Sequence, residues 1–116
     1  MKLPWWLPFG RVPEIGPAEL AARLGRKPWP QLIDVRTHAE FAGGHVRGAV
    51  NLSVTALASR LDTLELDPAR PVIAICLSGH RSVPAVRLLR QRGYDAQQLA
   101  GGMLAWRAQK LPEAKG

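Results

Sequence analysis

The fold of this chain is decided by residues 71–82, which read Pro71-Val72-Ile73-Ala74-Ile75-Cys76-Leu77-Ser78-Gly79-His80-Arg81-Ser82. The first six residues are a nearly continuous apolar run rich in β-branched side chains, which is typical of a strand covered on both faces. A tight loop follows, and then apolar residues recur at a helical period until Gly93. The stretch therefore predicts a central parallel strand, a short loop, and a helix that begins after a capping Ser82.

The segments on either side repeat this alternation of strand and helix. Residues 31–35 predict a second central parallel strand, residues 12–15 and 49–52 predict short strands, and residues 94–99 predict an edge strand. Helices are expected from Pro17 to about residue 24, from 54 to 64, and after the Gly101-Gly102 turn. The order predicts an α/β fold of three layers, with a central, mainly parallel sheet and helices on both faces.

The length of 116 residues predicts one compact domain at 12–111, preceded by an arm at 1–11 and followed by a tail at 112–116. The arm carries Trp5 and Trp6 between prolines, which makes it a poor signal peptide. We expect these tryptophans to pack on the domain rather than to anchor it to a membrane.

Sixteen basic residues against nine acidic ones give a net charge of +7. The arginines are spread along the whole chain without a polybasic run, and no nucleic-acid-binding signature accompanies them, so we expect no nucleic-acid partner. No apolar stretch approaches the roughly 18 residues that cross a bilayer, so we expect no stable membrane association. The single cysteine excludes an internal disulfide and fits a reducing, cytoplasmic location. The oligomeric state is left open.

The chemistry of the chain is expected at Cys76, because reactive groups in open parallel sheets lie where strands end at their carboxyl edge. The loop after Cys76 closes on a helix N-terminus, which turns backbone N–H groups inward and favours the thiolate form of a cysteine. Gly79 allows a backbone conformation that other residues avoid, and Arg81 supplies a forked cation for an oxyanion.

With these residues in view, the chain resembles the rhodanese family, the thiosulfate sulfurtransferases and their single-domain relatives. The resemblance rests on four segments in the family's order: 32–36 (LIDVR) followed by Glu40-Phe41, 44–51 (GHVRGAVN), 76–82 (CLSGHRS, or C-x-x-G-x-R-S) and 99–106 (LAGGMLAW). Together these segments extend the resemblance over nearly everything from Val12 to Leu111.

The resemblance implies a sulfurtransferase in which Cys76 takes a sulfane sulfur as a persulfide and passes it to a thiol or cyanide acceptor. The N–H groups of the loop would hold that sulfur, and Arg81 would bind the anionic end of a donor such as thiosulfate. Two successive displacements of this kind need no metal and no organic cofactor. The expected substrate-binding residues are Leu77, Ser78, Gly79, His80, Arg81, Ser82 and Arg36.

Some alternatives stay open at this point. Arg36 either faces the pocket or forms a structural pair with Asp34, and the pair is slightly preferred. Because residues 77 and 78 are neutral, a mercaptopyruvate, a persulfide or a protein-borne donor competes with thiosulfate. His45 is expected to be a hydrogen-bonded loop anchor and not a catalyst. The histidines share no metal-ligand spacing.

Two other functions compete with sulfur transfer. Cysteine-dependent phosphatases and arsenate reductases also place Cys and Arg at the ends of an anion-binding loop, but phosphatases use a loop one residue longer than the stretch between Cys76 and Arg81. The smaller ring should fit a sulfur atom better than a tetrahedral oxyanion. A non-catalytic rhodanese-like binding or sulfur-carrier module is the second alternative, although such modules typically lack the cysteine.

Overall fold

A computed structural model describes residues 4–7 and 10–116 of the chain. The sheet in this part of the chain has the strand order β1-β5-β4-β2-β3, and every pair of neighbours is parallel. The strands are β1 (Glu14–Ile15), β2 (Gln31–Asp34), β3 (Val50–Asn51), β4 (Val72–Ile75) and β5 (Ala96–Leu99). The helices are α1 (Pro17–Arg23), α2 (His38–Gly43), α3 (Val54–Arg60), the 3-10 helix η1 (Leu61–Leu64), α4 (Ser82–Gln91) and α5 (Gly102–Ala108).

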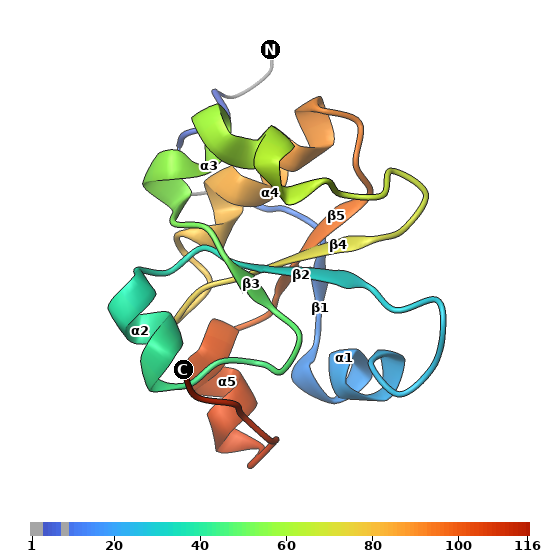
Figure 1. Ribbon diagram of the computed structural model, residues 1–116, viewed down its shortest axis with the longest axis vertical. Coiled ribbons are helices and arrows are strands. Elements are labelled where there is room, and N and C mark those ends of the chain that lie inside the picture. Colours follow the sequence, from blue (N-terminus) through green and yellow to red (C-terminus); the bar gives the residue numbers. More distant parts are fainter. Residues whose placement is uncertain (1–3, 8–9) are drawn as a thin grey trace.

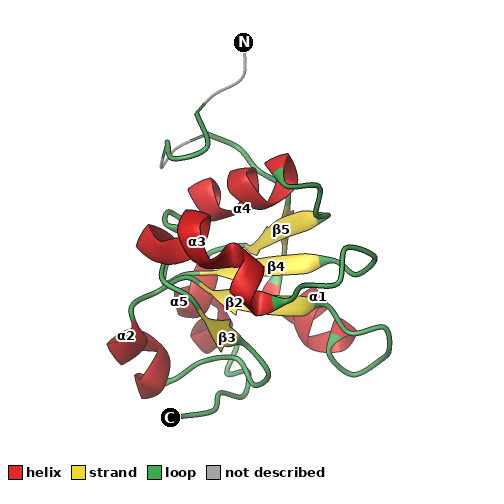
Figure 2. Cartoon of the chain, turned by 45° about the horizontal axis from the view of Figure 1, so that its top comes forward, coloured by secondary structure: helices red, strands yellow, loops and turns green. Residues whose placement is uncertain are grey.

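Helices cover both faces of the sheet, as the alternating pattern predicts (Figure 1). Successive β4 side chains point to opposite faces, so Val72 and Ala74 join one apolar cluster while Ile73 and Ile75 join the other. The first cluster includes side chains of α3 and α4, and the second includes side chains of α1 and α5. Figure 2 shows α3 and α4 on the near side of the strands and α1 on the far side. The predicted three-layer α/β architecture is confirmed.

Three expectations about the elements need correction. The strand predicted at the sheet edge, β5, lies inside the sheet, because β1 pairs with it and takes the edge. The helix expected over 54–64 is α3 followed by a 3-10 turn, η1. The short helix α2 was not expected, although Thr37 and Glu40 form a capping box at its start.

Both ends of the chain contact the domain where the structure describes them. In the predicted tail, the backbones of Ala114 and His45 exchange hydrogen bonds, and the N–H of Gly116 donates to the carbonyl of Ala42 at 2.9 Å. In the predicted arm, Trp5 packs against the cluster beneath α3 and α4, whereas Trp6 is 60% exposed. The packing expected of the two tryptophans is therefore found for Trp5 alone. Residues 1–3 and 8–9 of the arm lie outside the described residues.

No helix in the described part of the chain is long and apolar enough to cross a membrane.

Candidate active site

Three neighbouring parallel strands end at the same edge of the sheet, and the loops that follow them begin there. Cys76 comes directly after β4, Val35 after β2, and Ala100 after β5, with β4 between the other two. Cys76 is 1% exposed and belongs to the apolar cluster under α3 and α4. The sequence placed the thiol correctly at the carboxyl edge of a central strand.

The loop from Cys76 to Arg81 wraps back over the sulfur of Cys76. Gly79 has a φ of +98°, a backbone conformation that favours glycine, and its N–H donates to the Sγ of Cys76 at 3.0 Å. Ser78 Oγ and His80 Nδ1 lie 2.9 Å apart at the outer side of the loop. Leu77, in contrast, is partly buried and packs against the cluster under α1 and α5. The backbone of this loop therefore aims at least one donor at the sulfur.

The turn between β5 and α5 and the start of α5 are hydrogen-bonded to the backbone of the loop after Cys76. The N–H groups of Met103 and Leu104 donate to the carbonyls of Cys76 and Leu77 at 2.8 and 2.9 Å. Gly102, at a φ of +59°, permits this approach, because a Cβ there would lie 2.6 Å from the carbonyl carbon of Leu77 and closer still to the oxygen of Cys76. The tight turn that the sequence predicted at Gly101-Gly102 is confirmed. The contact of this turn with the loop after Cys76 was not predicted.

The sequence predicted that Ser82 caps α4, and this is wrong. Arg81 is at the N-cap position and Ser82 is the first helical residue. Its fully buried hydroxyl instead donates to Oε1 of Gln98 at 2.6 Å and lies 3.3 Å from Cys76 Sγ. The other end of the Gln98 amide donates to a carboxylate oxygen of Glu14 at 2.9 Å. A polar chain thus runs from β1 through β5 to the thiol. Gln98 and Glu14 were not among the expected site residues, since strand periodicity alone does not show which polar side chain faces inward.

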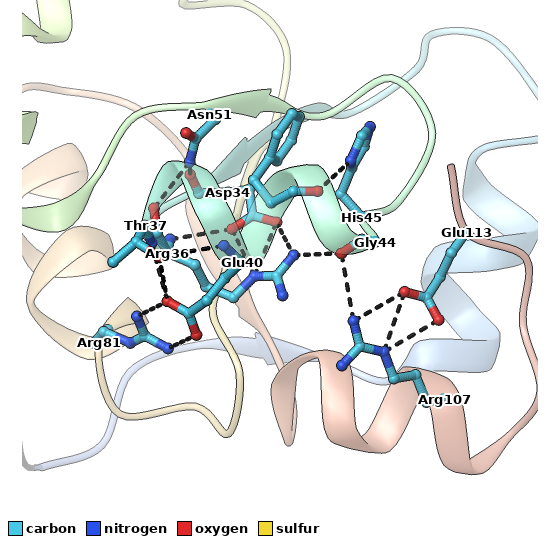
Figure 3. Close-up of polar contacts among 11 residues, drawn as sticks. Asp34, Arg36, Thr37, Glu40, Gly44, His45, Asn51, Arg81, Arg107 and Glu113 are labelled. Atoms are coloured by element: carbon cyan, nitrogen blue, oxygen red, sulfur yellow. Dashed lines mark hydrogen bonds and ion pairs between the residues drawn. The ribbon is translucent and has the colours of Figure 1, made fainter. Parts of the chain in front are cut away.

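Arg81 is engaged by Glu40 of α2 (Figure 3). Its two terminal nitrogens donate to the two carboxylate oxygens at 2.6 and 2.8 Å. The guanidinium lowers the pKa of Glu40 from the usual 4.5 to about 2, and the carboxylate raises the pKa of Arg81 in turn. The same carboxylate accepts hydrogen bonds from the backbone N–H and the hydroxyl of Thr37, which fixes it at the start of α2.

The donor-binding role expected of Arg81 stays a prediction, and the pair with Glu40 stands beside it. The sequence predicted that its guanidinium would bind the anionic end of a donor, whereas in the structure it holds a carboxylate of its own chain. Both side chains are about one third exposed. The observed contact joins the loop after Cys76 to α2 and balances the charge of Arg81.

The guanidinium of Arg36 is held by Asp34 and by the backbone of Gly44. The residue is 1% exposed, its Nε and Nη2 donate to the Asp34 carboxylate at 2.9 and 2.8 Å, and Nη2 also donates to the carbonyl of Gly44 at 2.7 Å. The structural pair, one of the two alternatives for Arg36, is therefore present. His45 is the loop anchor that the sequence predicted, with Nδ1 2.7 Å from the carbonyl of Phe41.

The expected loop residues 76–82 thus lie together, and the hydrogen bonds of the Arg36 guanidinium go to Asp34 and Gly44. Among the described residues, no group of three His, Cys, Asp or Glu side chains is placed to hold a metal ion. The arrangement is a buried thiol at the start of a helix, within reach of a backbone N–H and a serine hydroxyl. Such a thiol is suited to accept one small atom from a donor.

Comparison with known proteins gives the same picture. Residues 16–109 match the family model of the rhodanese-like domain. A sulfurtransferase of Allochromatium vinosum is 36% identical over 102 residues, which cover 87% of this chain and 94% of that protein. An HTH-type transcriptional regulator of Mycobacterium tuberculosis is 39% identical over 87 residues, 73% of this chain, but this chain spans only 38% of its length.

A solved structure shows the same fold. The solution NMR structure of the rhodanese-like domain from an Anabaena protein superimposes with a TM-score of 0.80 at 27% identity, over 91% of this chain and 81% of that one. The strand order, the loop around Cys76 and the match over most of the sequence agree with one another. The chain therefore belongs to the rhodanese-like domain family.

Proposed function

We propose that this protein is a sulfurtransferase that carries a sulfane sulfur on Cys76. The observation that carries the proposal is the loop in which the N–H of Gly79 lies 3.0 Å from Cys76 Sγ at the start of α4. The related sulfurtransferase of Allochromatium vinosum, alike over nearly its whole length, supports the same activity.

The reaction would proceed by two displacements at sulfur. The Cys76 thiolate attacks the outer sulfur of a donor such as thiosulfate, the S–S bond of the donor breaks, and sulfite leaves with the bonding electron pair. A thiolate or cyanide then attacks the outer sulfur of the Cys76 persulfide, and the Cys76 thiolate leaves. Electrons and atoms balance without a metal or an organic cofactor.

The contacts of the loop assign different tasks to its residues. The Gly79 N–H stabilises negative charge on the sulfur of Cys76, and charge-assisted hydrogen bonds of this kind are roughly twice as strong as neutral ones. Arg81 holds the loop against α2 through Glu40. Because that pair leaves the loop little net charge for an anion, it favours an organic or protein-borne persulfide as donor, with thiosulfate and mercaptopyruvate as the anionic alternatives.

The phosphatase alternative is less well supported by the same contacts. A phosphatase needs its arginine fork directed at the phosphate oxygens, and here the fork is occupied by the Glu40 carboxylate. The loop lies close enough for its Gly79 N–H to bond the thiol sulfur itself, which favours a single sulfur atom as guest.

Intact-mass measurement after incubation with thiosulfate tests the proposal. We expect the wild type to gain the mass of one sulfur atom, to lose it on adding a reductant, and to form thiocyanate from thiosulfate and cyanide. Cys76→Ser should keep the fold, gain no sulfur and lose on the order of a thousandfold or more in turnover. Substantial thiocyanate formation by Cys76→Ser would sink the assignment. Faster hydrolysis of p-nitrophenyl phosphate than sulfur transfer by the wild type would favour the phosphatase.

A further inference from the structure

An apolar hollow opens beside the catalytic loop. It has a volume of about 320 Å³ and is lined by Trp5, Trp6, Val54, Thr55, His80, Arg81 and Pro84. We refer to it as the tryptophan pocket. Its walls come from three separate parts of the chain. These are the arm, the first turn of α3, and the loop after Cys76 together with the first turn of α4. Its size is at the lower end of the range for small-molecule sites and is suited to one ring or a short branched chain.

The arm is fixed where it forms this pocket. Trp5 is partly buried against the core cluster that also contains Cys76. The N–H of Leu7 donates to the carbonyl of Pro4 at 3.2 Å, which closes a turn around the two tryptophans, and Nη1 of Arg87 on α4 donates to the carbonyl of Leu7 at 2.7 Å. Trp6 remains 60% exposed, so part of its indole is free to cover a ligand.

The two basic side chains that line the tryptophan pocket already have partners. The guanidinium of Arg81 is balanced by Glu40, and Nδ1 of His80 lies 2.9 Å from the Ser78 hydroxyl. The surface left to a ligand is therefore mainly aromatic and aliphatic. Binding of an uncharged organic group to such a surface is favourable, because apolar area is removed from water, whereas a small inorganic anion would be stabilised little there.

We propose that the tryptophan pocket binds the organic group of a thiol acceptor, with an aromatic or branched aliphatic thiol as the preferred class. This inference rests on the proposed sulfur transfer by Cys76. The pocket shares His80 and Arg81 with the loop, so a thiol whose organic group lies there brings its sulfur to the mouth of the loop. Its thiolate attacks the outer sulfur of the Cys76 persulfide, the Cys76 thiolate leaves, and an organic persulfide is released.

A single-turnover experiment isolates this step from the loading of the protein. Wild type charged with sulfur is mixed with benzyl mercaptan or with cyanide, and the loss of the persulfide is followed by intact mass. We expect Trp6→Ala to lower the ratio of the benzyl mercaptan rate constant to the cyanide rate constant about five- to tenfold, the size of one aromatic contact. Trp29→Ala is the matched control, because Trp29 is also an exposed tryptophan but does not line this pocket. It should leave the ratio unchanged.

A binding measurement separates failure of the pocket from failure of the proposed function. Benzyl methyl sulfide has the same ring but cannot accept sulfur, and we expect it to quench tryptophan fluorescence in wild type and in Cys76→Ser, and to do so much less in Trp6→Ala. An unchanged rate ratio together with no binding of the sulfide to wild type would overturn the pocket. Binding without any persulfide on Cys76 would retain the pocket and overturn the sulfur transfer.

Discussion

At the scale of single residues, the position of the loop after Cys76 depends on the absence of a side chain at Gly102. The carbonyls of Cys76 and Leu77 bond the first N–H groups of α5 because Gly102 presents only a hydrogen to them. A methyl group there has no free direction, since the nearest atoms are backbone and cannot rotate away.

We therefore expect Gly102→Ala to lower the free energy of unfolding by about 1–3 kcal/mol, the usual cost of overpacking, and to slow sulfur transfer by moving the loop. Gly43→Ala is the control, because a Cβ at Gly43 meets nothing within 4 Å and its φ is ordinary. Urea unfolding and the thiocyanate assay measure the two effects. Equal stability and equal activity of the two variants would contradict the supporting role of the turn.

The residues at the site show which part of it a sequence can predict. Cys76, Gly79 and the Gly101-Gly102 turn were predictable, because strand ends and glycines carry local signals. The partners of Ser82 and Arg81 were not, because Gln98 and Glu40 lie 16 and 41 residues away along the chain. Each of these two contacts depends on register or on strand order, which no local pattern fixes.

At the scale of elements, α2 and the loop after Cys76 are joined by the pair of Glu40 and Arg81. The helix α2 has six residues, too few for a clear helical period. The capping box at Thr37 and Glu40 was the one local signal from which it could have been predicted. The central strands β2 and β4 were predicted well, because burial on both faces makes their sequences continuously apolar. The predicted position of β5 at the sheet edge was wrong, because the strand that pairs with it there, β1, has only two residues and gives a weak sequence signal.

The pair should make stability depend on pH in a defined window. The pKa of Glu40 is lowered from 4.5 to about 2 in the folded protein, so its contribution is fully present above about pH 4.5 and is lost as the pH falls toward 2. Because both partners are partly exposed, we expect the contribution to be below about 1 kcal/mol. Glu40→Gln keeps an acceptor for the Thr37 N–H but loses the charge. The difference in unfolding free energy between wild type and this variant should shrink across that window. A difference that stays constant with pH would argue that the charge contributes nothing.

At the scale of the whole molecule, the chain has a net charge of +7, while Arg81 in the loop after Cys76 is paired with Glu40. In the proposed reaction, an anionic donor would then be attracted mainly by the field of the molecule and not by a contact at the site. Such a field is screened by salt, with a Debye length that falls from about 30 Å at 0.01 M to about 3 Å at 1 M ionic strength.

We expect kcat/KM for thiosulfate to fall about threefold or more between 0.01 and 0.5 M ionic strength, as for electrostatically steered association. An uncharged organic persulfide as donor serves as the comparison and should show little change. Initial rates at a series of NaCl concentrations measure both donors. Equal salt dependence for the two would indicate that the field of the protein does not attract the donor.

The burial of Cys76 also bears on how the protein meets oxidants. Cys76 is 1% exposed and carries the only thiol in the chain, so no second cysteine of the same chain can form a disulfide with it. A sulfenic acid at this sulfur would have no second cysteine in the chain to trap it before further, irreversible oxidation. In the proposed reaction, the sulfur carried on Cys76 stands one S–S bond beyond Sγ, so an oxidant would meet that atom first. Damage would then fall on the atom that is exchanged at every turnover, and a thiol reductant would restore Cys76 with its carbon–sulfur bond intact.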